Sequence, residues 1–243
     1  MPIEQISGEV YGKINDSQLA VADFLTFLNE NKKLDYHTKG ELQIGYNNLI
    51  NIDLLKTNAD MLFDELFLNK TPKGIIILSE SYLTKLCSIG ALTLEQIACS
   101  LIGKYDPFKP EKKEKLENIK KTVKEYAGPE LSKSFLDNFM GIFNEVSNLR
   151  NMASHSNLAK NLFLKEEFKK GSWDSERQKN PLYNSRPKQS MYGFLKGDLS
   201  IIHQNGEASL TDKLNEYSIK YLEMVKDVYN GLLNHNKSFM VKL

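Results

Sequence analysis

Apolar residues recur at intervals of three and four along almost the whole of this chain, and that spacing gives an α-helix one apolar face. The clearest stripe consists of Leu83, Leu86, Gly90, Leu94, Ile97 and Leu101. Because glycine has no side chain, Gly90 would let a neighbouring helix approach closely. We therefore predict an all-α fold in which this segment is a core helix, although the β-branched run at 75–78 also fits a short strand.

The same periodicity, with its capping residues, predicts the other helices. They are expected from Asp16, as N-cap, to about residue 30; from Tyr46 to Leu68; over 111–126; from Glu130 into 148–157; over about 158–169; and from Thr211, as N-cap, to about residue 232. The first two would form an N-terminal helical hairpin over residues 1–70, packed on a helical domain over 71–243. The last helix would close the bundle.

Residues 170–207 interrupt the helical pattern and are typical of a loop-rich insertion. They carry two prolines, the sole tryptophan and two of the three arginines. The Asn205-Gly206 pair is a turn signal, so a small β-hairpin is expected at 194–207.

The composition limits the class of protein. With 41% apolar residues the chain can bury a core, and with a net charge of +1 an anionic partner would have to meet a local basic patch. Cys87 and Cys99 lie twelve residues apart, without the spacing of a disulfide framework or a metal site, which favours a reducing cytoplasm. The N-terminal residues contain no apolar core segment and no run of 18 apolar residues occurs, so neither secretion nor a membrane span is expected.

The segment NLRNMASHSN, residues 148–157, holds one of only three arginines in a chain with 29 lysines. On a helical wheel Arg150 falls at the edge of the apolar stripe formed by residues 135–149. A partly buried cation must be paired there, and the planar guanidinium suits phosphate or carboxylate. One structural explanation is a salt bridge to a core carboxylate such as Glu95 or Glu145.

A histidine follows this arginine at close range. His155 lies five residues after Arg150, so an ideal helix would point the two side chains roughly 140 degrees apart. They can meet if the helix bends or ends among residues 151–155, or if another chain completes the site. Asn151 shares a helical face with His155, so its amide could orient the imidazole.

The Arg-Asn-x3-His pattern in LRNMASH resembles the signature of the HEPN superfamily. The earlier segment GALTLEQIACSLIGKY, with Glu95 among apolar residues, is similar to the first core helix of that family, and the likeness covers about residues 79–170 and the final helix. The resemblance implies a helical bundle with metal-independent endoribonuclease activity and no cofactor. It also implies a homodimer, in which Arg150, Asn151 and His155 of two protomers form one composite site.

That resemblance implies a chemistry which these residue types can perform. His155, with an ordinary pKa of about 6.5, could move the 2′-hydroxyl or leaving-group proton, while Arg150 holds the phosphate. RNA is the implied substrate because its own 2′-hydroxyl is the nucleophile, which leaves a 2′,3′-cyclic phosphate. The family further suggests a toxin or an abortive-infection effector of antiviral defence, with an antitoxin or a sensor protein as partner.

Two features leave alternatives open. One toxin subfamily places a tyrosine two residues after the histidine, where this chain has Asn157, which argues against control by adenylylation of that tyrosine. The family also includes inactive members, so the alternative function is a HEPN module that binds RNA, a nucleotide or a partner protein.

RNA contact would need local basic surface. The candidates are Lys120, Lys121 and Lys124 on a lysine-rich helix face, and Arg186 and Lys188 beside the aromatic residues of the insertion. The lysine-rich face is more simply explained as the solvated side of a helix. The remaining histidines have no partner at useful spacing and are expected to be surface or loop residues: His37, His203 and His235.

Overall fold

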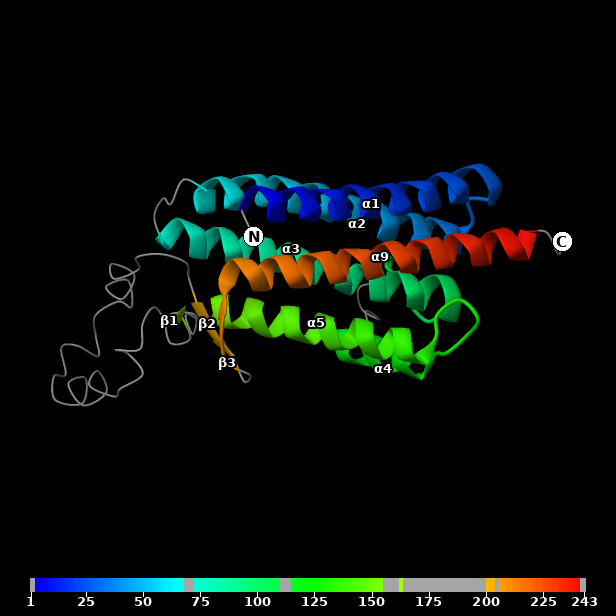
Figure 1. Cartoon of the computed structure of the whole chain (residues 1–243). Coiled ribbons are helices and arrows are strands. Elements are labelled where there is room, and N and C mark those ends of the chain that lie inside the picture. Colours follow the sequence, from blue (N-terminus) through cyan, green and yellow to red (C-terminus); the bar gives the residue numbers. More distant parts are fainter. Residues whose placement is uncertain are drawn as a thin grey trace.

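The computed structural model describes residues 3–67, 72–109, 115–154, 162–163, 200–203 and 206–240 (Figure 1). These residues form the helices α1 (Ile3–Asn31), α2 (Tyr36–Phe67), α3 (Pro72–Ile97), η1 (Ala98–Ile102), α4 (Leu116–Glu125), α5 (Lys133–Ser154) and α9 (Leu210–Met240). A small sheet contains the strands β1 (Leu162–Phe163), β2 (Ser200–His203) and β3 (Gly206–Ser209). The predicted all-α class is confirmed, with this sheet at one end of the helices.

The long helices lie side by side in an elongated bundle (Figure 1). α1 and α2 pair on one side, α3 and α9 lie in the middle, and α5 with α4 covers the other side. α1 packs on α9 and α2, α2 packs on α3, and α5 packs on both α3 and α9. The last helix therefore returns through the bundle between the first helix and α5.

α3 is the central helix. Its predicted stripe is largely buried, and at Gly90 two neighbours come so close that a β-carbon would overlap the Tyr221 hydroxyl of α9 and the Phe143 ring of α5. The predicted close approach at Gly90 is confirmed. Residues 77–102 are long and apolar enough to cross a bilayer, but 56% of that window is buried within the bundle. The central place of this helix in the bundle explains its apolarity.

Two helices begin earlier than the sequence predicts. α1 starts at Ile3, because Val10 and Ile14 continue its buried face ahead of Asp16. Asp16 is therefore an exposed residue within the helix and not its N-cap. α2 starts at Tyr36, ten residues before the predicted start, and the carboxylate of Asp35 accepts a hydrogen bond of 2.7 Å from the backbone N–H of Thr38, which caps the helix.

Two further boundaries are settled by the structure. The run at 75–78, which also fitted a strand, is helical and belongs to α3. Thr211 lies inside α9, which begins at Leu210, so its prediction as N-cap is wrong. α3 continues into η1, a π-helical turn that ends at Gly103 in the left-handed conformation, with φ of 67°.

The sheet is antiparallel in the order β1-β2-β3. β2 and β3 form the predicted hairpin, and Gly206 is already paired with His203, so this glycine belongs to the strand. The predicted helix over about 158–169 is wrong at Leu162–Phe163, which form β1 and pair with β2. Residues 164–199, which hold most of the predicted insertion, lie outside the described residues.

Candidate functional site

Arg150 lies in the last two turns of α5, one residue beyond the buried Leu149. The side chain is half-buried, and its Nε atom is buried without a hydrogen-bond partner within the described part of the chain. Its described neighbour is the thiol of Cys87, on the facing side of α3. The predicted position at the edge of the apolar stripe is confirmed.

The described residues do not form the salt bridge that was one structural explanation for Arg150. Glu95 is hydrogen-bonded to Tyr105, and Glu145 is hydrogen-bonded to Tyr217. Among the ion pairs formed by described residues, none joins a carboxylate to Arg150. Within the described ranges the guanidinium is therefore hydrogen-bonded to the Cys87 thiol but paired with no carboxylate.

Cys87 faces this arginine but is not prepared as a nucleophile. Burial raises the pKa of its thiol, and this effect outweighs the hydrogen bond with Ser147, at 3.8 Å between sulfur and oxygen, and the positive charges of Arg150 and Lys120. The thiol is consequently neutral at physiological pH, and a neutral thiol is a poor nucleophile. Cys87 acts as a packing residue beside the arginine.

The predicted RNA-binding lysines of α4 differ in whether their ammonium groups are already engaged within the protein. The ammonium of Lys120 donates to Glu117 at 3.0 Å and to Asn144 at 3.2 Å, and it lies 4.6 Å from the centre of the Phe143 ring. It is therefore held against α5. Lys121 and Lys124 are exposed, although Lys124 lies 3.5 Å from Asp137. Of the three predicted lysines on α4, only Lys121 and Lys124 are therefore accessible to a partner in solvent.

The other predicted site residues lie at or beyond the edge of the description. Asn151 continues α5 by one residue after Arg150, and the helix is described through Ser154. His155, Arg186 and Lys188 lie outside the described residues. The geometry that relates His155 to Arg150 thus stays a prediction.

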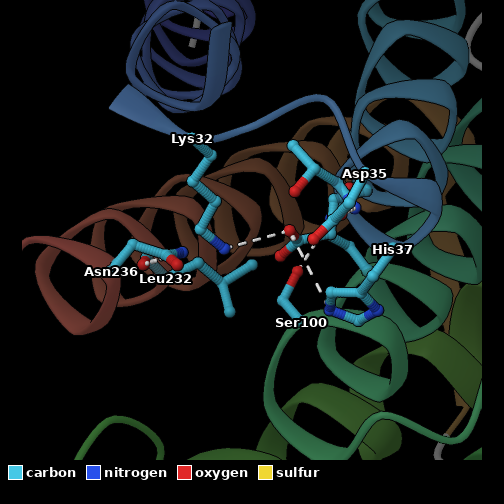
Figure 2. A network of polar contacts seen from close by, with 9 residues as sticks. Lys32, Asp35, His37, Ser100, Leu232 and Asn236 are labelled. Carbon is cyan, nitrogen blue, oxygen red and sulfur yellow. Dashed lines mark hydrogen bonds and ion pairs between the residues drawn. The ribbon is translucent and has the colours of Figure 1, made fainter. Parts of the chain in front are cut away.

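A second polar cluster surrounds Glu41, at the opposite end of the bundle from the sheet (Figure 2). Glu41 is fully buried in α2, and its Oε2 accepts a hydrogen bond of 3.1 Å from Lys32 and lies 4.0 Å from Nε2 of His37. Its Oε1 has no partner among the described residues. Figure 2 shows Lys32, His37 and Ser100 arranged around this carboxylate, from three separate segments of chain.

The sequence pattern did not predict this cluster, because the expected helix began at Tyr46. With the observed start at Tyr36, Glu41 lies among the buried residues of the helix, where a carboxylate is unusual. A carboxylate at a buried position of the helix is the signal that could have revealed this cluster. The 4.0 Å separation between His37 and Glu41 is longer than a hydrogen bond, so the pair is an ion pair at most and not a preformed catalytic dyad.

A third cluster corrects the prediction for His235. Its Nδ1 lies 2.6 Å from Oε1 of Glu130, whose Oε2 accepts a hydrogen bond of 2.7 Å from Tyr126. His235 is therefore not an unpartnered surface residue. The pairing spans 105 residues of sequence, so no local pattern could have revealed it. Of the other two, His37 is exposed as predicted, and His203 lies in strand β2 and not in a loop.

Among the described residues, no group of three or more His, Cys, Asp or Glu side chains is arranged to hold a metal ion. No protein-family model, no curated protein and no solved structure matches this chain. The geometry around Arg150 and the sequence pattern that contains it are therefore the evidence that bears on function.

Proposed function

We propose that this chain is a metal-independent endoribonuclease of the HEPN type, in which Arg150 holds the scissile phosphate. The observation that carries the proposal is the half-buried guanidinium of Arg150, with a buried Nε that has no partner within the described ranges. Such a cation lowers stability unless another group binds it. A phosphate group of RNA fits this need, because guanidinium binds phosphate with two parallel hydrogen bonds.

The proposed reaction uses the RNA as its own nucleophile. His155 accepts the proton of the 2′-hydroxyl while this oxygen attacks the adjacent phosphorus, and the bond to the 5′ oxygen breaks after a proton is returned to it. The products are a 2′,3′-cyclic phosphate and a 5′-hydroxyl. Arg150 stabilises the charge that develops on the non-bridging oxygens, and Asn151 orients the imidazole.

A homodimer is part of the proposal. A regular α5 would direct the side chains of Arg150 and His155 to different sides, so a second copy of α5 would complete each site. The exposed Lys121 and Lys124 would contact phosphates along the RNA, together with Arg186 and Lys188. Lys120 would stabilise the packing of α4 on α5, since its ammonium is already engaged.

The biological part of the proposal comes from the resemblance alone. On this basis the protein would be a cytoplasmic toxin or defence effector whose activity is released by a sensor or restrained by an antitoxin. The alternative is an inactive HEPN module that binds RNA, a nucleotide or a partner protein through the same surface. Arg150 alone would account for phosphate binding in that module.

The test is cleavage of a fluorescent single-stranded RNA in the presence of EDTA. We expect wild-type protein to yield 2′,3′-cyclic phosphate ends, and Arg150→Ala and His155→Ala to reduce cleavage by at least about 100-fold. Lys33→Ala is the matched control, because it removes one exposed cation in the connection after α1 and should retain most of the activity. An RNA with a 2′-deoxy sugar at the cleavage position should stay intact.

Two results would contradict the proposal. Cleavage that disappears with EDTA would exclude the metal-free reaction. RNA binding by wild type without cleavage, weakened by Arg150→Ala but not by His155→Ala, would favour the inactive binding module.

A further inference from the structure

The outer side of the α1–α2 pair exposes large apolar side chains. On α2 these are Tyr46, Ile50, Leu54 and Met61, whose spacing of four, four and seven residues places them on one face of the helix. Ile50 is 57% exposed and Leu19 of α1 is 63% exposed. Single exposed apolar residues are common on proteins, but a stripe on one helix face marks an interaction surface.

Hydrogen bonds join α1 and α2 at Tyr46 and at Lys56. Asn29 donates a hydrogen bond of 3.0 Å to Tyr46, and Lys56 donates one of 3.3 Å to Asn15. These contacts fix the register of the antiparallel pair and set Leu19 level with Leu54. We call this surface the α1–α2 face and define it by Leu19, Tyr46, Ile50, Leu54 and Met61.

Acidic residues border the apolar stripe. Glu9, Asp16, Asp23 and Glu30 recur at intervals of seven along α1, and Asp53, Asp60 and Asp64 follow the stripe along α2. Between residues 8 and 64 the chain has nine Asp and Glu against five Lys, a net charge of −4, whereas the whole chain is at +1. Within the described ranges no cation pairs with Asp23 or Asp53, so these two charges are available to a partner.

We propose that the α1–α2 face binds a basic amphipathic helix of a partner protein. The apolar residues of that helix would cover Ile50 and Leu54, and its lysine or arginine residues would meet Asp53 on α2 and Asp23 on α1. Helices with apolar residues at intervals of three and four bind apolar surfaces in this way, and complementary charge fixes their position. A second acidic copy of the same face would place like charges opposite each other.

This surface is separate from the proposed nuclease site. Arg150 lies on α5, which is on the other side of the bundle from α1 and α2 (Figure 1). A partner on the α1–α2 face would therefore leave the arginine open. The inference does not depend on the proposed function, and its test uses variants far from Arg150.

The experiment measures fluorescence anisotropy of a labelled synthetic helix built from leucine and lysine, with leucine at helical spacing. We expect the full-length protein to bind this peptide, and Ile50→Ser and the double variant Asp23→Asn/Asp53→Asn each to weaken binding by about tenfold. Leu34→Ser is the matched control, because Leu34 is 56% exposed but lies in the connection after α1. Glu117→Gln/Glu125→Gln on α4 is the control for the loss of two charges.

Comparison peptides test the specificity of binding, and sedimentation tests whether the protein itself forms a dimer through this face. A leucine and glutamate helix should not bind, and a scrambled leucine and lysine peptide should bind at least about tenfold more weakly. Equal binding by all variants and controls would overturn the proposal. Sedimentation that shows a dimer, lost in Ile50→Ser, would also overturn it by assigning the face to a second copy. RNA cleavage should be unchanged in Ile50→Ser, so a failure of the peptide-binding proposal can be distinguished from a failure of the proposed nuclease function.

Discussion

The hydroxyl group of Tyr221 occupies the space beside Gly90 in which a β-carbon would lie. Tyr221 is fully buried in α9, and its hydroxyl has no hydrogen-bond partner among the described residues. Its ring stacks on Phe139, with ring centres 5.4 Å apart. The missing side chain at Gly90 thus lets α3 and α9 approach each other at the centre of the bundle.

Gly90→Ala is therefore expected to destabilise the fold. Alanine improves helix propensity by about 1 kcal/mol, but overpacking a rigid core costs about 1–3 kcal/mol. Because the overlap is with a fully buried ring, we expect a net loss of about 1–2 kcal/mol in the free energy of unfolding, measured by urea denaturation.

The same contact predicts a rescue. In Gly90→Ala/Tyr221→Phe the overlap with the hydroxyl is removed, while Cζ of the ring and Phe143, at 2.6 Å, still crowd the new methyl group, so the double variant should recover part of the loss, about 0.5–1 kcal/mol, relative to Gly90→Ala. Tyr221→Phe alone should lie within about 1 kcal/mol of wild type, because the hydroxyl it removes has no partner. Additive effects of the two substitutions would show that the contact does not limit packing.

Replacement of Arg150 by methionine is expected to separate stability from activity. Methionine fills a similar volume without a charge, so the free energy of unfolding should stay unchanged or rise by about 1 kcal/mol, while RNA cleavage falls by at least about 100-fold. Thermal unfolding and the fluorescent RNA assay measure the two effects on one sample. A loss of more than about 2 kcal/mol in Arg150→Met would show a structural role for the arginine.

The buried carboxylate of Glu41 depends on Lys32, which is its only described hydrogen-bond partner. Lys32→Ala should therefore destabilise the fold by about 1–3 kcal/mol, because it leaves a buried charge without its counter-charge. Lys32→Met/Glu41→Gln removes both charges and should lie within about 1 kcal/mol of wild type. The double-mutant cycle, measured by urea denaturation, would contradict this account if the double variant were less stable than Lys32→Ala.

The Glu130 cluster predicts a loss of stability in acid. Partial burial would raise the pKa of Glu130, but the hydrogen bonds from Tyr126 and His235 outweigh burial and hold it below its ordinary value of about 4.5. Since the folded pKa is the lower one, the carboxylate stabilises the fold above pH 4.5, and this contribution disappears as the pH falls through the folded value.

Glu130→Gln is the variant that tests this pH dependence. At neutral pH it should be less stable than wild type by about 1 kcal/mol, and the two proteins should converge as the pH falls through the lowered pKa of Glu130. Urea denaturation at each pH measures the difference. Glu125→Gln, in the last turn of α4, serves as control, and a constant difference between wild type and Glu130→Gln at all pH values would contradict the prediction.

The candidate site was only partly predictable from the sequence. The periodicity around residues 135–149 placed Arg150 at the edge of a buried stripe, because a helix repeats every 3.6 residues and needs no other information. It could not show that Glu95 and Glu145 are bonded to Tyr105 and Tyr217, since Tyr105 lies in the loop after η1 and Tyr217 lies on a separate helix, α9. The engagement of Lys120 by Asn144 and Phe143 was hidden for the same reason.

By itself the sequence determined the helical class, the core stripe of α3, the close approach at Gly90 and the hairpin of β2 and β3, because each depends on local periodicity or on the conformational range of one residue. Tertiary structure decided that α1 begins ahead of Asp16 and α2 ahead of Tyr46, since Val10 and Ile14 of α1 and Leu42 and Ile44 of α2 are buried within the bundle. It also decided the partners of Glu41 and His235. A charge selects its counter-charge by distance in space, which depends on how the helices pack.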